Sequence, residues 1–223
     1  MTRNVVAAML MLGLAPLAGV AQAEKSRQWD FEVFLEDRPI GEQTFAVSSE
    51  GEALRVDIQA RFDVDFLFFN AYDYHHRNTE YWQGDCLQSL DAETDDNGTP
   101  HRLAGRREGD RFVLRVNGEA TTLPGCVMTF AYWNPAILEQ SRLLNTQDGR
   151  FMPIQVAALG EETLAVAGTP VAAERFRLEA EDLRIDLWYA REDRRWLKLS
   201  SLIDNNRLVF QLRHHDGQVA LLP

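Results

Sequence analysis

The amino-acid sequence predicts an all-β, mainly antiparallel fold: a strongly curved meander sheet or partial barrel with one short helix near 135–144. Three observations predict this class. Apolar and polar residues alternate with period two along much of the chain, short turn-forming gaps separate the alternating runs, and only one segment carries helix signals. Side chains alternate across a strand, so each run would present one apolar and one polar face.

The longest alternating run covers 54–66, where the even-numbered residues are apolar and those between them are polar. Fully extended, a strand of this length would reach about 43 Å at ~3.3 Å per residue. Such a strand normally bends, which favours a curved sheet. Shorter runs of the same kind occupy 29–35, 176–180, 183–189, 197–203 and 208–212. The short gaps between successive runs indicate hairpins and therefore an antiparallel meander.

One segment argues for a helix. Asn134 is a suitable N-cap, Pro135 suits the first helical position, and the residues up to Gln140 continue the pattern, with an expected end near Leu144. We see no internal repeat and no linker, so residues 24–223 are expected to form a single antiparallel β domain. Its apolar face would be covered by a second sheet, by closure into a barrel, or by the helix over a half-barrel.

The N-terminus indicates export. Residues 1–23 carry Arg3, then an apolar stretch that ends in an Ala-Gln-Ala triplet, which predicts a signal peptide cleaved after Ala23. An uncleaved membrane anchor is the alternative, but Gly13 and Pro16 interrupt the stretch. No later apolar run is long enough to span a bilayer. We therefore expect a periplasmic or otherwise exported bacterial protein that is not membrane-spanning after cleavage.

Charge and cysteine content narrow the function further. The net charge of −11 repels phosphate backbones, so nucleic acid is not an expected partner. Cys86 and Cys126 are the two cysteines of the chain. In an oxidising compartment an isolated pair is expected to form a structural disulfide. The alternative, a redox-active pair, usually needs a C-x-x-C spacing, which these two do not have.

The segment from Asn70 to Trp82 concentrates polar and aromatic residues. If it is a strand, one face carries six of them: Tyr72, Tyr74, His76, Asn78, Glu80 and Trp82. An imidazole, a carboxylate and phenols are the materials of acid–base chemistry. His76 and Glu80 would lie about 13 Å apart along the strand, too far to bind one metal. The alternative interpretation is a buried hydrogen-bond network that holds strand register.

Other searches assign no catalytic residue, cofactor or metal. The adjacent pairs His75-His76 and His214-His215 would point to opposite faces of a strand, so neither pair chelates by itself. Nucleophile-elbow, zinc-protease and phosphate-loop motifs are absent from the sequence. The aromatic run 130–133 before Asn134 either holds the helix against the sheet or lines a pocket.

A family resemblance rests on two groups of residues. The run from Tyr74-His75 through Glu80-x-Trp82-x-Gly84 to Asn97-Gly98, and the later segment 187–199, resemble an uncharacterised family of exported bacterial proteins with a domain of unknown function. That family is distantly similar to periplasmic lipoprotein-carrier half-barrels. The resemblance implies a curved sheet around an apolar cavity and brings no activity or catalytic residue.

The leading hypothesis is a non-catalytic envelope protein that binds a hydrophobic small molecule or lipid inside a curved β-sheet. Its expected ligand-binding residues are Phe66, Tyr72, Tyr74, His76, Glu80, Trp82, Tyr132 and Trp133. One alternative is an enzyme whose polar strand face uses His76 and Glu80 for acid–base chemistry. A second is a protein-interaction module that holds a partner at an exposed sheet edge. The oligomeric state is left open.

Overall fold

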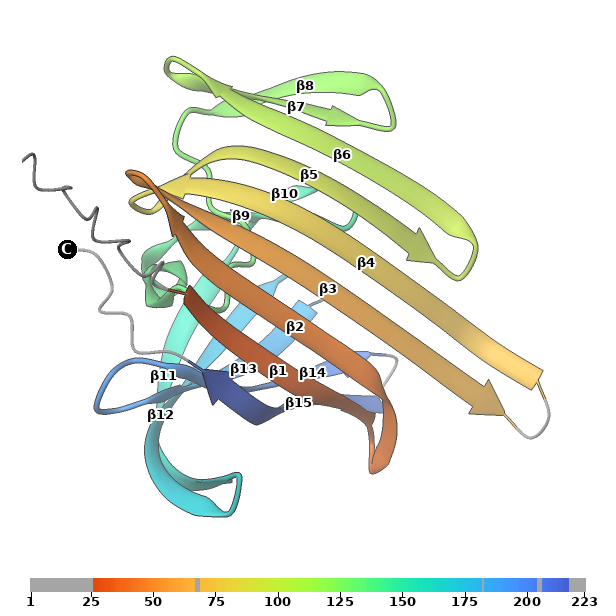
Figure 1. The fold of residues 1–223 in the computed structure, drawn as a ribbon, viewed down its shortest axis with the longest axis vertical. Helices are drawn as coiled ribbons and strands as arrows, with labels where there is room; N and C mark the ends of the chain where they lie inside the picture. The colour runs from red at the N-terminus through yellow and green to blue at the C-terminus, as the bar shows by residue number, and fades with distance from the viewer. Residues whose placement is uncertain (1–25, 67–68, 182, 204–205, 217–223) are drawn as a thin grey trace, which may run out of the picture.

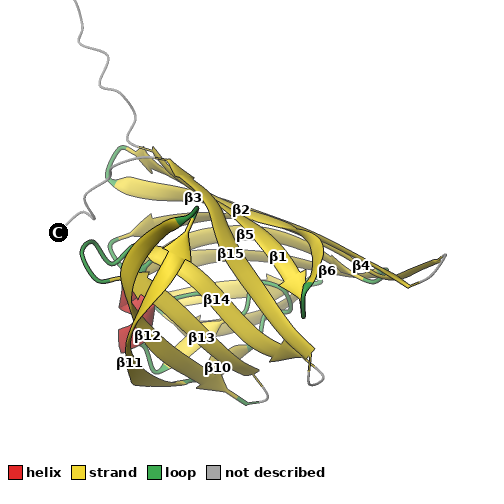
Figure 2. Ribbon diagram, turned by 90° about the horizontal axis from the view of Figure 1, so that it is seen from below, coloured by secondary structure: helices red, strands yellow, loops and turns green. Residues whose placement is uncertain are grey.

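A computed structural model describes residues 26–66, 69–181, 183–203 and 206–216. The predicted signal peptide lies outside these ranges. The predicted fold class is confirmed: the described residues are mostly antiparallel strands in one large curved sheet (Figures 1 and 2). Within the described ranges, no helix is long and apolar enough to cross a membrane.

Thirteen strands in the described part of the chain make up the large sheet. They are β1 (Ser26–Leu35), β2 (Arg38–Glu50), β3 (Ala53–Phe66), β4 (Phe69–Gln83), β5 (Cys86–Asp96), β6 (Thr99–Glu108), β7 (Arg111–Val116), β8 (Glu119–Pro124), β11 (Gln155–Val166), β12 (Thr169–Ala180), β13 (Leu183–Ala190), β14 (Trp196–Ile203) and β15 (Asn206–Asp216). The predicted long strand 54–66 is β3 and the predicted strand around 70–82 is β4.

The strand order shows how the chain builds the sheet. The order is β11-β12-β13-β14-β15-β1-β2-β3-β4-β5-β6-β7-β8, and the paired neighbours in it are antiparallel. The chain therefore starts in the middle of the sheet, runs out to the β8 edge, crosses to the β11 edge, and returns to the middle. Among the described residues, β8 and β11 do not pair with each other, so the barrel is not closed.

Curvature has local causes. β-Bulges place one extra residue in β4, opposite Val64 and Asp65 of β3, and one in β5, opposite Tyr81 and Trp82 of β4. Each bulge bends a strand and increases its twist. Gly41 permits a close approach of β2 to β3: it has a φ of +154°, and a Cβ there would lie 1.9 Å from the Arg61 carbonyl oxygen. These features bend the long strands that the alternation pattern predicted.

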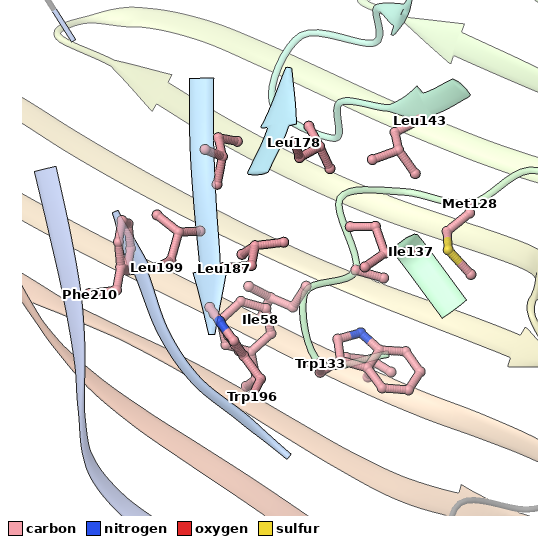
Figure 3. Close-up of a cluster of buried hydrophobic side chains, with 14 of the residues drawn as sticks. Ile58, Met128, Trp133, Ile137, Leu143, Leu178, Leu187, Trp196, Leu199 and Phe210 are labelled. Atoms are coloured by element: carbon pink, nitrogen blue, oxygen red, sulfur yellow. The ribbon is translucent and has the colours of Figure 1, made fainter. Parts of the chain in front are cut away.

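The segment that connects the two edges fills the inner face. We call residues 125–154 the crossover segment. It contains a 3-10 helix η1 (Pro135–Glu139) and a small two-stranded sheet of β9 (Arg142–Leu144) and β10 (Phe151–Pro153). Figure 3 shows four side chains of this segment, Met128, Trp133, Ile137 and Leu143, in one buried cluster with side chains from both halves of the large sheet, which include Ile58, Leu187 and Trp196. The inner face is therefore covered by a packed segment of the same chain.

The predicted helix is correct at its start and wrong at its end. The Asn134 side chain accepts a hydrogen bond from the Ala136 N–H, and Pro135 follows, as the capping pattern indicated. The helix ends at Glu139 instead of near Leu144, because Gln140 is extended and the chain then forms β9. The Leu144 N–H donates to the Met128 carbonyl, 2.9 Å away, so a tertiary backbone bond overrides the local helical pattern.

Candidate functional site

The inner face of β4 carries the predicted polar and aromatic row. From Tyr74 to Trp82, the even-numbered residues are buried, whereas the odd-numbered residues between them are half-buried or exposed. The prediction that these side chains share one face is confirmed. The side chain of Phe66, also predicted to bind a ligand, lies outside the described residues.

Glu80 is the most enclosed charged group of this row, with 0 % of its surface exposed. Its carboxylate accepts hydrogen bonds from Asn78 Nδ2 at 2.8 Å, from Trp82 Nε1 at 2.9 Å, and from the Thr129 side chain. No cationic side chain in the described ranges forms an ion pair with it. Burial raises the pKa of the Glu80 carboxyl, and the three donors only partly offset this effect. Because Thr129 belongs to the crossover segment, Glu80 joins that segment to the sheet.

Further bonds fasten the crossover segment at the same place. The sulfur atoms of Cys86 and Cys126 lie 2.01 Å apart, at disulfide distance. The Leu87 N–H donates to the Val127 carbonyl at 2.9 Å. Two more contacts lie at the C-terminal end of the aromatic run 130–133. Asn134 Nδ2 donates to Asp85 Oδ1 at 2.9 Å, and the rings of Trp82 and Trp133 meet edge to face with centroids 5.7 Å apart. The residues from Glu80 to Leu87 thus attach the crossover segment to the β4–β5 hairpin.

His76 lies next to the aromatic end, and its ring stacks on that of Tyr74 with centroids 6.4 Å apart. It is 4 % exposed, and its Nδ1 lies 2.9 Å from the Thr94 hydroxyl. Burial lowers the pKa of His76 to about 4, so the imidazole is neutral at pH 7. The hydrogen bonds of His76 and Glu80 go to different residues, and both side chains are sealed from solvent. The structure does not bring these two residues together, so the geometry does not favour an acid–base pair.

Aromatic rings gather at the N-terminal end of this row of β4 residues, around Tyr74. Tyr74 stacks on Phe62 across the β3–β4 pair, with ring centroids 5.2 Å apart, and on its neighbour Tyr72 at 6.5 Å. The half-buried Tyr72 donates its hydroxyl to Asp96 Oδ1 at 2.7 Å. Tyr74 is 5 % exposed, and its hydroxyl has no hydrogen-bond partner among the described residues. Burial raises the pKa of the Tyr74 phenol well above its usual value, with smaller contributions from Tyr72, Asp96 and Tyr132.

Tyr132 brings the crossover segment to this aromatic end. Its ring is half-buried and lies 5.4 Å from the Trp196 ring, and its carbonyl accepts the Tyr189 hydroxyl at 2.9 Å. Its phenol makes a smaller contribution to the raised pKa of Tyr74. Six of the eight predicted residues form two groups. Tyr72, Tyr74 and Tyr132 make the aromatic end, and Glu80, Trp82 and Trp133 make the attachment of the crossover segment.

Two hollows of the described surface lie on the opposite, outer face. One of about 590 Å³ crosses β2 to β6 and is lined by outward side chains that include Arg61, His75, Arg77 and Arg102. A second, of about 440 Å³, crosses β4 to β7 beside Tyr81. Sequence reasoning did not predict them, because the polar side of an alternating strand is expected to face solvent. Likewise, nothing local signals the long-range partners Thr94 and Thr129.

Comparisons with known proteins agree with this architecture. No curated protein matches the chain. A similar solved structure is a β-barrel-like protein of a domain of unknown function, DUF1849, from Brucella abortus, with a TM-score of 0.63 and 11 % sequence identity. The match covers 87 % of this chain and 98 % of that one. At this identity the similarity shows a shared fold only.

The family follows from the sequence match. A family model described as a domain of unknown function, DUF6134, matches residues 31–213, which include every strand from β2 to β14, half of β1 and most of β15. The sequence resemblance to an uncharacterised family with a barrel-like fold is confirmed. The chain belongs to the DUF6134 family.

Proposed function

We propose that this chain is an exported, non-catalytic protein that binds an amphipathic small molecule, such as an acyl chain with a polar end, at the aromatic end of β4. One observation carries the proposal: the Tyr74 hydroxyl is buried among aromatic rings and has no partner in the described part of the chain. An unsatisfied buried donor costs about 1–3 kcal/mol. A polar group of a ligand would remove that cost.

The surrounding side chains support the same place. The rings of Phe62 and Tyr72 stack on that of Tyr74, and the phenol of Tyr132 in the crossover segment contributes to the raised pKa of Tyr74. Aromatic walls with a few polar groups are typical of small-molecule sites. Tyr72 and Tyr132 are only half-buried, so rotation of either ring would open a route to the Tyr74 hydroxyl. Because the crossover segment fills the rest of the inner face, the ligand would occupy this end instead of a central cavity.

Export is the second part of the proposal. The signal-peptide pattern of residues 1–23 supports it, and the disulfide distance between Cys86 and Cys126 is in keeping with an oxidising compartment. Fractionation of the native host tests it. We expect the protein in an exported fraction with an N-terminus at Glu24, and a cytosolic protein that retains residue 1 would contradict this part.

Ligand binding is tested with the chain purified from its host. Native mass spectrometry should detect a co-purified small molecule, and a fluorescent fatty acid should bind and be displaced by unlabelled fatty acid. Tyr74→Phe removes only the hydroxyl and should weaken probe binding about fivefold, as expected for one hydrogen bond worth about 1 kcal/mol. Tyr81→Phe is the matched control, because its hydroxyl accepts a hydrogen bond from Arg55 on the outer face. An empty protein that does not bind the probe would refute ligand binding.

A further inference from the structure

Three side chains of metal-binding type meet on the outer face of the β3–β4 pair. Asp63, Asp73 and His75 each offer one ligand atom, and these atoms all lie within 4.8 Å of one another. His75 Nε2 is 2.9 Å from Asp73 Oδ1. The side chains of Asp63, Asp73 and His75 are 39 %, 41 % and 45 % exposed, so an ion could reach them from solvent. None of the three belongs to the aromatic end or to the attachment of the crossover segment.

Strand register explains why they meet. Asp63 and Asp73 are directly opposite each other in the antiparallel pair, and His75 follows Asp73 by two residues on the same face. Both aspartates lie just past the last residues that pair with β2 and β5, so this part of the hairpin extends beyond its neighbours (Figure 1).

Sheet stability alone does not account for this arrangement. Like charges directly opposite each other destabilise a strand pair. Arg61 offsets part of this repulsion, because its Nε is 3.1 Å from Asp63 Oδ2. Asp95, which pairs with His75 across β4–β5, adds negative charge on the other side. A cation between the two aspartates would convert the repulsion into attraction.

We propose that Asp63, Asp73 and His75 bind a divalent transition-metal ion of the Zn²⁺ class. A single imidazole with two carboxylates suits Zn²⁺ and its neighbours, whereas Ca²⁺ and Mg²⁺ prefer oxygen ligands alone. Two atoms bound to one ion at about 2.1 Å each can be at most about 4.2 Å apart. The widest spacing here therefore has to shrink by at most about 0.6 Å, which small rotations of half-exposed side chains provide.

The neighbouring surface supplies access. His75 also lines the hollow of about 590 Å³ on the outer face, so ion and water can approach from that side. Three protein ligands leave at least one coordination position for water or for a small ligand held in the hollow. The site thus goes beyond the proposed function, because it lies on the opposite face of the sheet from Tyr74.

Isothermal titration of the tag-free full chain with ZnCl₂ tests the proposal, and we expect one ion per chain. His75→Ala and Asp73→Asn should each weaken binding by about tenfold or more. Asp63→Asn removes the like-charge pair, so it should weaken Zn²⁺ binding while the chain keeps its thermal stability. Weaker Zn²⁺ binding together with unchanged thermal stability shows that Asp63 acts as a metal ligand and not as a structural residue. Circular dichroism checks that each variant is folded.

Two controls make the result specific. His101→Ala removes another histidine that lines the same hollow and should leave the titration unchanged. Tyr74→Phe should also leave it unchanged, so failure of the ligand proposal and failure of the metal proposal are distinguishable. If wild-type protein binds no Zn²⁺ at one per chain, or if His75→Ala and Asp73→Asn bind as wild type does, the site is refuted.

Discussion

Acidification should destabilise the fold through His76. Burial lowers the pKa of this imidazole from its ordinary 6.5 to about 4. Between these two values the unfolded chain binds a proton at His76 and the folded chain does not. The free energy of unfolding therefore falls as the pH falls through this window. At about 1.36 kcal/mol per pH unit, the displacement of the His76 pKa corresponds to about 3.4 kcal/mol of free energy of unfolding. About 2 kcal/mol of this is lost by pH 5.

Urea denaturation at pH 7 and pH 5, followed by tryptophan fluorescence, measures this loss. The test variant is His76→Asn, which cannot be protonated and places a polar atom where Nδ1 meets the Thr94 hydroxyl. Between pH 7 and pH 5, the free energy of unfolding of wild type should fall by about 2 kcal/mol more than that of this variant. Glu80 and His215, whose pKa values are also displaced, are present in both proteins, so their contributions cancel.

Thr94→Val is the control, because it keeps His76 and removes its hydrogen-bond partner. It should lower the free energy of unfolding at pH 7 by about 1 kcal/mol and keep most of the additional loss at pH 5. Equal losses in wild type and His76→Asn would refute the reasoning that a buried neutral imidazole governs this part of the pH dependence.

Three further predictions concern the inner face. The raised pKa of the Glu80 carboxyl makes the free energy of unfolding fall as the pH rises above about 4.5, and Glu80→Gln should remove this fall. In urea denaturation between pH 5 and pH 8, the free energy of unfolding of the variant should therefore rise relative to that of wild type. Parallel pH profiles of the two proteins would contradict this. The double variant Cys86→Ser/Cys126→Ser should have a free energy of unfolding about 4 kcal/mol lower in guanidinium denaturation, because this is the chain-entropy value for a disulfide that closes a loop of this length. Wild type treated with reductant should show the same loss. Ile137→Ala should cost about 3 kcal/mol because it empties part of the core, whereas the exposed control Leu159→Ala should cost less than about 0.5 kcal/mol by the same measurement.

Local patterns predicted the strands well because alternation is a property of each strand by itself. The run 54–66 became β3, and the face shared by Tyr74, His76 and Glu80 followed from two-residue periodicity alone. The helix was predicted about five residues too long, because pairing of β9 with β10 is a tertiary contact that no local pattern reports.

The contacts of the candidate functional site were harder to predict, because they are also tertiary contacts. The sequence placed His76 and Glu80 on one face, but their partners come from β5 and from the crossover segment, through contacts that depend on the path of the whole chain. Asp63 and Asp73 were not predicted as metal ligands, because that prediction considered only the histidines and Glu80. A register shift between Val64 and Asp65 sets their pairing, because without it Asp63 would lie opposite Tyr72 instead of Asp73, and no local pattern signals such a shift.

The pairing of β1 with β15 has a consequence for how the molecule assembles. The first and last strands are adjacent, so the halves of the sheet on either side can join in register only after residue 216 has emerged. Contacts between such distant residues make folding slow, because a long loop must close before they form. A nascent chain that stops short of β15 therefore leaves an unpaired edge on β1, where misassembly with another chain would begin.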